Sequence, residues 1–179
     1  NVNQSYGGIY LNVNATGSNI IARNTIKNIS LSHGATAVAP LFTGIYNVAG
    51  GNDSIAYNKI GGPNAGDAIT ISSNLGTIST TYGIYTAAGT DTIVNNSISN
   101  INFSTTTGGI GFYGIYLANA ANLIIENDTV SNISSAYTGA SAASLRGIYA
   151  AGSGLRSIRN NEVNNISTAS TYTGATTAS

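Results

Sequence analysis

The apolar positions of this chain repeat as one motif written five times. The tripeptide Gly-Ile-Tyr recurs at intervals of 31 to 39 residues. Each copy is followed by an aliphatic residue 9 to 12 positions beyond its isoleucine, then a short polar residue three positions later, then Ile or Val two positions after that. Recurrence at such an elastic period indicates a repeat architecture. We therefore divide the single segment 1–179 into units of approximately 6–41, 42–80, 81–111, 112–144 and 145–179.

Two columns of polar residues accompany the apolar ones. The first consists of Asn24, Asn58, Asn96, Asp128 and Asn161. The second consists of Asn28, Asn100, Asn132 and Asn165, and the second unit departs from it with Gly61-Gly62-Pro63. A side-chain amide carries both donors and an acceptor, so stacked amides can pass hydrogen bonds from one repeat to the next. We expect both columns to form structural ladders, with Asp128 accepting hydrogen bonds in the first.

The apolar pattern favours strands over helices. Short runs rich in Ile and Val lie between Gly, Asn, Ser and Thr, which is typical of β-structure. No segment shows the spacing of an amphipathic helix, which excludes ankyrin and tetratricopeptide units, and the leucine consensus of leucine-rich repeats is missing. The prediction is an all-β, right-handed parallel β-helix of about five coils. Its variable return loops are expected at 30–43, 61–82, 102–113 and 134–146, with an extra strand at 68–71.

Composition narrows the classes of function. Only 7% of the residues are charged and the formal net charge is zero. The densest basic group, Arg146, Arg156 and Arg159, is too sparse for a nucleic-acid binder, which must neutralise phosphates. The chain has no cysteine, hence no disulfide and no thiolate metal site, and no apolar run long enough to span a membrane. Both ends fall inside the repeat, so we expect part of a longer array or a subunit that stacks on identical copies.

The complete pattern, Gly-Ile-Tyr, a short spacer, then Ile-x-x-Asn-x-Ile-x-Asn-Ile, resembles the right-handed parallel β-helix repeats of pectate-lyase-like proteins. It is more similar still to the tandem repeats of very large secreted surface and adhesin proteins of Bacteroidetes-type bacteria. The resemblance covers essentially the whole chain and implies a secreted, extracellular location associated with the cell surface. It says little about activity, because this fold hosts lyases, hydrolases, tailspikes and inert stalks.

The acidic residues do not form the cluster that enzymes of this fold require. Lyases pair aspartates with calcium and a basic residue, and hydrolases need two or three acids. Asp53 and Asp91 share one position in adjacent coils, where they form either a weak calcium site or two solvated turn residues. Glu126 and Arg159 share another position and predict a surface ion pair. His33 only partly matches the Gly-His-Gly segment of polygalacturonase-like enzymes, so we expect no catalytic residue, no metal and no cofactor.

Two features carry functional hypotheses. If the isoleucine of Gly-Ile-Tyr points inward, the tyrosine points outward. Tyr10, Tyr46, Tyr85, Tyr116 and Tyr149 would then form a stripe that binds carbohydrate or a partner, or that return loops cover. The triplets Asp-Ser/Thr-aliphatic at 53–55, 91–93 and 128–130 resemble the O-glycosylation signal of secreted Bacteroidetes-type proteins. In that resemblance the acceptors would be Ser54, Thr92 and Thr129.

These observations favour a structural role. We expect a rigid, glycosylated stalk, filament or adhesin segment on a bacterial surface, whose partners are further repeats or identical subunits stacked end to end. The alternative is a β-helix module that binds or degrades cell-surface or environmental polysaccharide.

Overall fold

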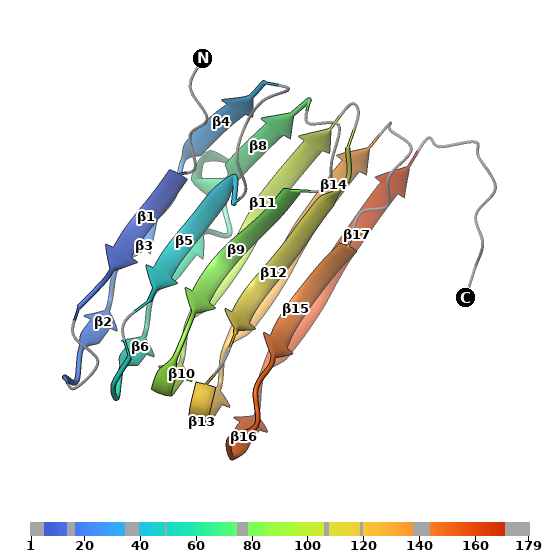
Figure 1. Cartoon of the computed structure of the whole chain (residues 1–179). Helices are drawn as coiled ribbons and strands as arrows, with labels where there is room; N and C mark the ends of the chain where they lie inside the picture. Colours follow the sequence, from blue (N-terminus) through green and yellow to red (C-terminus); the bar gives the residue numbers. More distant parts are fainter. Residues whose placement is uncertain are drawn as a thin grey trace.

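All the strands of the computed structural model run parallel and wind into a β-solenoid of about four turns (Figure 1). The prediction of an all-β parallel β-helix is confirmed, whereas the right-handed winding stays a prediction. The structure describes residues 6–13, 17–34, 40–48, 50–74, 79–105, 108–118, 120–137 and 144–170. Within these ranges there is no α-helix, and no helix has the length and hydropathy to cross a membrane.

Three sheets form the sides of the solenoid, and each contributes a strand to every one of five levels. Sheet A contains β1 (Tyr6–Leu11), β5 (Phe42–Asn47), β9 (Ser79–Thr86), β12 (Ile110–Leu117) and β15 (Ser144–Ala150). Sheet B contains β2 (Ile20–Ala22), β6 (Ser54–Ala56), β10 (Gly89–Val94), β13 (Ala120–Glu126) and β16 (Arg156–Arg159). Sheet C contains β3 (Thr25–Ile26), β4 (Ile29–His33), β7 (Lys59–Gly61), β8 (Ile69–Ser73), β11 (Ser97–Thr105), β14 (Thr129–Tyr137) and β17 (Glu162–Ser170).

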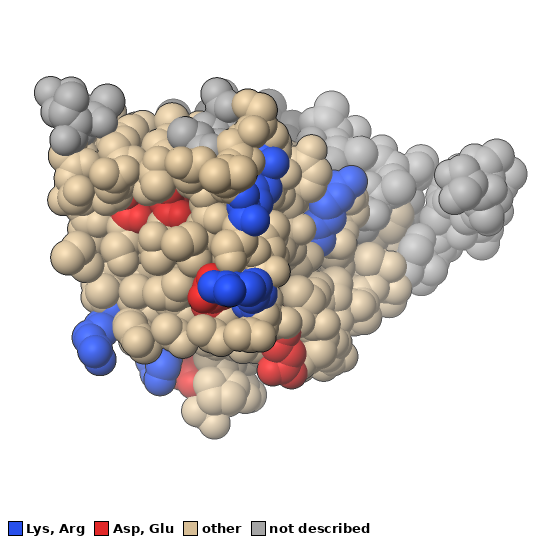
Figure 2. All heavy atoms as spheres, turned by 90° about the horizontal axis from the view of Figure 1, so that it is seen from below, with Lys and Arg blue, Asp and Glu red and all other residues tan. Residues whose placement is uncertain are grey.

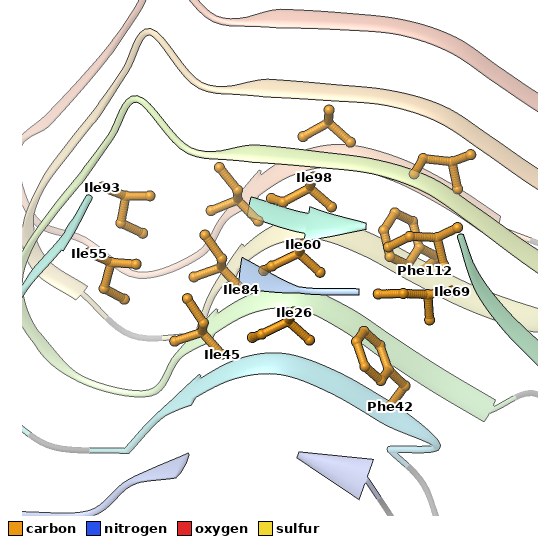
Figure 3. Close-up of a cluster of buried hydrophobic side chains, with 14 of the residues drawn as sticks. Ile26, Phe42, Ile45, Ile55, Ile60, Ile69, Ile84, Ile93, Ile98 and Phe112 are labelled. Carbon is orange, nitrogen blue, oxygen red and sulfur yellow. The ribbon is translucent and has the colours of Figure 1, made fainter. Parts of the chain in front are cut away.

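Identical apolar residues stack on one another inside the solenoid. The isoleucines of successive Gly-Ile-Tyr copies are paired in register across sheet A, and Ile45, Ile84 and Ile115 are fully buried. Ile26, Ile60 and Ile98 of sheet C follow one above the other in the same way (Figure 3). Full burial of such a side chain stabilises by about 1.5–3 kcal/mol. The core is therefore a set of apolar columns parallel to the solenoid axis.

Sheet C extends further than the sequence indicates. The predicted return loops beginning at 30, 102 and 134 start as strand, because β4, β11 and β14 continue to His33, Thr105 and Tyr137. The extra strand predicted at 68–71 is confirmed as β8, which pairs with β4 and with the second half of β11. It completes sheet C after an excursion that contains the short 3-10 helix η1 (Ala65–Asp67). Ser and Thr are acceptable on a pleated surface, so their abundance did not mark loops here.

The motif glycine is required by the contact between neighbouring coils. A Cβ atom at Gly83 would lie 2.5 Å from the carbonyl oxygen of Gly114 and 2.8 Å from Cγ2 of Ile98. Gly8, Gly44 and Gly114 meet the next coil in the same way, at 2.5–2.6 Å from a glycine carbonyl oxygen. A side chain at this position would push apart both the coils and the core column of sheet C.

Gly83→Ala should lower the free energy of unfolding by about 1–3 kcal/mol, the usual cost of overpacking. Gly66→Ala is the matched control, because nothing lies within 4 Å of a Cβ atom at Gly66. Denaturant unfolding followed by circular dichroism measures both variants. Equal unfolding midpoints for the two would contradict this account of the glycine column.

Candidate functional surfaces

A continuous ladder of side chains lies at the corner between sheets B and C. The backbone N–H and the amide Nδ2 of Asn58 donate to Oδ1 of Asn96 at 2.9 and 3.0 Å, and Nδ2 also donates backward to the carbonyl of Ile21 at 2.8 Å. The backbone N–H and Nδ2 of Asn24 donate in the same way to Oδ1 of Asn58, and those of Asn96 donate to Oδ1 of Asp128. The backbone N–H of Asp128 donates to Oδ1 of Asn161. The first polar column therefore connects all five levels.

The residue before each ladder position adopts the left-handed backbone conformation that turns this corner. These residues are Arg23, Tyr57, Asn95, Asn127 and Asn160, with φ between 55° and 60°. Asn tolerates this region better than most residues, which accounts for the three asparagines. The side-chain ladder lies inside the corner and holds the tight turn of one coil to that of the next.

The second asparagine column is not the continuous ladder predicted from the sequence. Asn28, Asn100, Asn132 and Asn165 all have φ between 47° and 56°. Their side chains find different partners: Asn165 donates to Asn132, whereas Asn100 donates to the backbone oxygen of Asn64 at 2.9 Å. The excursion after Gly61 interrupts the column at the second level. Asn is present here because sheet C bends through left-handed residues.

Asp128 is the one acid in the buried ladder. Its Oδ1 accepts two hydrogen bonds from Asn96, at 2.6 and 2.8 Å, but Oδ2 is buried without a partner among the described residues. Asn58 and Asn96 carry an NH₂ group at the position of Oδ2, and this group donates to a backbone carbonyl oxygen of the preceding coil. Oδ2 of Asp128 therefore faces a hydrogen-bond acceptor where the asparagines place a donor. Burial raises the pKa of Asp128 to about 6, against a lowering effect of the Asn96 donors.

Asp53 and Asp91 lie inside the corner between sheets A and B, so they are not solvated turn residues. Asp53 accepts hydrogen bonds from the backbone and side chain of Asn19, at 3.1 and 2.7 Å, and from Asn47 Nδ2 at 2.8 Å. Donors thus occupy the oxygens that a calcium ion would need. Burial raises the pKa of Asp91 to about 7, the Thr86 hydroxyl lowers it, and the charge of Asp53 raises it. No group of three metal-ligating side chains occurs in the described ranges.

The other acids are paired on the surface or exposed. Arg159 donates to Glu126 at 2.6 Å, and this hydrogen bond holds the pKa of Glu126 below its usual range. Lys27 donates to Asp67 at 2.7 Å with the same effect on the pKa of Asp67. On the face that Figure 2 shows, charged side chains are few and scattered. His33 ends β4 beside Ser73, and burial lowers its pKa. None of these groups faces a second acid across a cleft.

The tyrosines form an aromatic face on the outside of sheet A. The ring centroids of Tyr10, Tyr46, Tyr85, Tyr116 and Tyr149 follow one another at 5.5, 4.6, 5.4 and 5.2 Å, and each pair is stacked. Tyr10 is 60% exposed and Tyr149 is 40% exposed, while the middle three are half-buried. The face is thus accessible at least at its two ends.

A second column, missed in the sequence, widens this face. Tyr82 and Tyr113 contact the first column at 4.8–5.2 Å, and Arg146 donates to the Tyr113 hydroxyl at 2.9 Å while lying over its ring. Strand alternation would place residues three apart on opposite faces. Here Gly83 and Ile84 are both buried, while Tyr82 and Tyr85 on either side of them are partly exposed and their rings contact each other. Burial and the neighbouring phenols raise the pKa of Tyr82 to about 12.

A groove of about 350 Å³ lies at the N-terminal end of the aromatic face. It is lined by Tyr6, Gly7, Tyr10, Pro40, Thr43 and Tyr46. Gly7 and Thr43 occupy the register positions that hold Tyr82 and Tyr113 in later coils. The small residues leave a hollow beside the stacked rings, where the later coils present a filled surface.

The predicted glycosylation triplets occur at two different places in the coil. Ser54 and Thr92 are register partners on the outside of sheet B, whereas Thr129 begins β14 of sheet C. All three hydroxyl residues are partly exposed. The aspartate that precedes each hydroxyl residue is buried: Asp53 before Ser54, Asp91 before Thr92 and Asp128 before Thr129. In the folded chain only the second residue of each triplet is accessible.

Asp128→Asn should raise the free energy of unfolding near pH 8 and leave it unchanged near pH 3.5. The folded chain binds the Asp128 proton more tightly than the unfolded chain, so this group's contribution to stability falls as the pH rises from about 4 to about 6. Two pKa units correspond to roughly 3 kcal/mol, so a gain on the order of 1–3 kcal/mol is expected. Urea unfolding at both pH values measures it.

Glu126→Gln is the matched control, because Glu126 is an ionised surface acid of the neighbouring strand. Its replacement should not stabilise the fold at pH 8. A loss of stability in Asp128→Asn at pH 8 would contradict the proposed mismatch in the ladder.

Comparison with known proteins assigns no family to this chain: no family model, no curated protein and no solved structure matches it. The fold therefore rests on the strand register described above. The function has to be inferred from the surfaces and the inner columns of the solenoid.

Proposed function

We propose that this chain is a structural segment of a secreted protein at a bacterial cell surface, where it forms part of a rigid stalk, filament or adhesin. The observation that carries the proposal is the continuity of the columns. The inner isoleucines and the ladder from Asn24 to Asn161 run through all five levels, and each level contacts only its neighbours. Length and stiffness then accumulate with the number of coils, as in other solenoids.

The distribution of acids supports a role without catalysis. Asp53, Asp91 and Asp128 are buried, and Asp67 and Glu126 each accept a hydrogen bond from a basic side chain. Glycoside hydrolysis needs two carboxyl groups that flank a bound sugar. The described residues offer no such pair at the groove beside Tyr10 and Tyr46. The low charge likewise favours contacts with further repeats or subunits over contacts with nucleic acid.

The location is tested on the cells that produce the protein. Antibody against the folded chain should label intact cells, and mild protease treatment should remove the label. Mass spectrometry of the released protein tests the proposed glycans on Ser54, Thr92 and Thr129. Labelling that requires permeabilised cells would overturn the extracellular role.

A mechanical role predicts stepwise unfolding under force. When the chain is pulled from its two ends, coils should detach one at a time, because each is held only by its neighbour. Each step should release about 30–40 residues, or roughly 100–140 Å of extended chain. Force spectroscopy measures these increments. A single release of the whole chain at low force would contradict the proposal.

The aromatic face favours a second candidate, a module that binds polysaccharide. Stacked, partly exposed tyrosines present flat apolar surfaces with hydroxyl groups, and the groove at Tyr10 and Tyr46 adds a concave edge. Sugars with apolar ring faces could lie along the columns. This candidate concerns binding and shares the extracellular setting of the first.

If polysaccharide binds here, Tyr46→Ala should weaken binding by about tenfold, which corresponds to 1.4 kcal/mol. Tyr57→Asn is the matched control: Tyr57 is exposed but lies at the corner of sheets B and C, and Asn tolerates its φ of 58°. Calorimetry with a panel of soluble polysaccharides measures the affinities. Equal affinity for the two variants would exclude the aromatic face.

A further inference from the structure

The left-handed residue at the corner between sheets B and C is not the same type in every coil. It is asparagine in three coils, at Asn95, Asn127 and Asn160, but Arg23 and Tyr57 hold the position in the other two. Arginine and tyrosine adopt this conformation at a cost in backbone strain that asparagine largely avoids. Strain that persists where an easier residue would serve is a feature of functional sites. The two exceptions therefore call for a reason beyond the turn itself.

Arg23 lies over the ring of Tyr57. Its guanidinium carbon is 5.0 Å from the ring centroid, so the side chain extends from the first coil to the level of the second. A cation over an aromatic face is attracted by the ring, which restricts a long side chain that would otherwise move freely in solvent. Tyr57 thus acts as a positioning residue that holds the charge of Arg23 beside the second coil.

Lys59 brings a second cation to the same level. It begins β7, two residues after Tyr57, and its register partners are Thr25 in the coil before and Ser97 in the coil after. Lys59 is exposed, and no acid among the described residues pairs with it. A groove of about 380 Å³ lies between Arg23, Lys59 and these two hydroxyl residues. No carboxylate lines this groove.

The charges of the whole chain make this groove distinctive. The formal net charge is zero, but three of the six acids are buried, whereas all six basic residues are exposed. Two further acids pair with Lys27 and Arg159. Four basic residues are thus left without an acidic partner in the described part of the chain, and two of these four line one groove. Their fields add there and attract an anion.

We propose that this groove binds a tetrahedral oxyanion, the sulfate or phosphate group of an ester. The guanidinium of Arg23 can donate two parallel hydrogen bonds to two of its oxygens, and the ammonium of Lys59 can donate to a third. The hydroxyl groups of Thr25 and Ser97 supply further donors on either side of Lys59. The inference goes beyond the proposed rod function and does not depend on it.

A carboxylate would use the same groove incompletely. Its two oxygens lie in one plane and are matched by a single guanidinium, which leaves Lys59 without a partner. The donors of the groove come instead from three successive coils, spread over about 9.6 Å by the strand spacing, and approach a shared ligand from different directions. Uncharged sugars gain nothing from two cations, so binding here is separable from binding on the aromatic face of sheet A.

Titration with sodium sulfate tests the site. The protein is labelled with nitrogen-15, the ionic strength is kept constant with sodium chloride, and the amide chemical shifts are followed. Saturable shifts are expected at the backbone N–H groups of Tyr57, Lys59 and Ser97. Sodium phosphate at pH 8 and sodium acetate are titrated in the same way. Tighter binding of sulfate or of phosphate identifies the ester, and acetate should bind at least tenfold more weakly than either.

Lys59→Gln and Arg23→Asn should each weaken sulfate binding by about tenfold. Arg23→Asn also relieves the strain of the left-handed backbone, so its unfolding midpoint in urea should stay level or rise. A loss of binding in that variant is then not a loss of fold. Arg156→Gln is the matched control, because it removes the same charge from an exposed residue of β16, outside the groove. Its affinity for sulfate should equal that of the unchanged chain.

Three results would overturn the proposal. Shifts that are absent, or that grow without saturation, would show that the groove holds no site for the anion. Equal affinity for acetate and sulfate would show a groove that responds to charge alone. An equal loss of affinity in Arg156→Gln and Lys59→Gln would show diffuse attraction to the charge of the whole chain, not binding between Arg23 and Lys59.

Discussion

The spacing between parallel strands, about 4.8 Å, is the constraint on which the rest of this structure depends. Every residue lies that far above its counterpart in the previous coil, so each position must accept a copy of itself as its nearest neighbour. Isoleucine satisfies this requirement in the core, and tyrosine does so outside sheet A, where the rings stack at 4.6–5.5 Å. Glycine satisfies it where one coil's carbonyl leaves no room for a Cβ atom.

Asparagine satisfies the same constraint at a buried corner for a different reason. A buried polar group needs partners, and an amide can donate to the coil on either side while its oxygen accepts from the coil before. A carboxylate cannot, because it only accepts when ionised. The ionised Asp128 leaves Oδ2 without a partner among the described residues, and burial of this carboxyl group raises the pKa of Asp128. Asp53 resolves the problem differently, since Asn19 and Asn47 supply its donors.

The fold could be predicted from the sequence because stacking of like on like leaves a visible signal. The columns through Ile45, Ile60 and Asn58 were all placed from spacing alone. Asn28 and Asn100 were misread because an asparagine column has two physical causes, amide ladders and left-handed backbone, which the sequence does not separate. Tyr82 and Tyr113 were missed because strict alternation places residues three apart on opposite faces, whereas the Gly and Ile of Tyr-Gly-Ile-Tyr are both buried and both tyrosines lie outside. The burial of Asp91 left no signal, since short polar residues are typical of exposed turns.

The same constraint determines how stability is distributed along the solenoid. In a globular domain all elements share one core, whereas in a solenoid each coil contacts its neighbours, so a column gains one contact for each coil that stacks on it. Ile45, Ile84 and Ile115 are fully buried because each lies between two isoleucines of the same column. Stability therefore accumulates with the number of coils, and a substitution in one column acts on the two coils beside it.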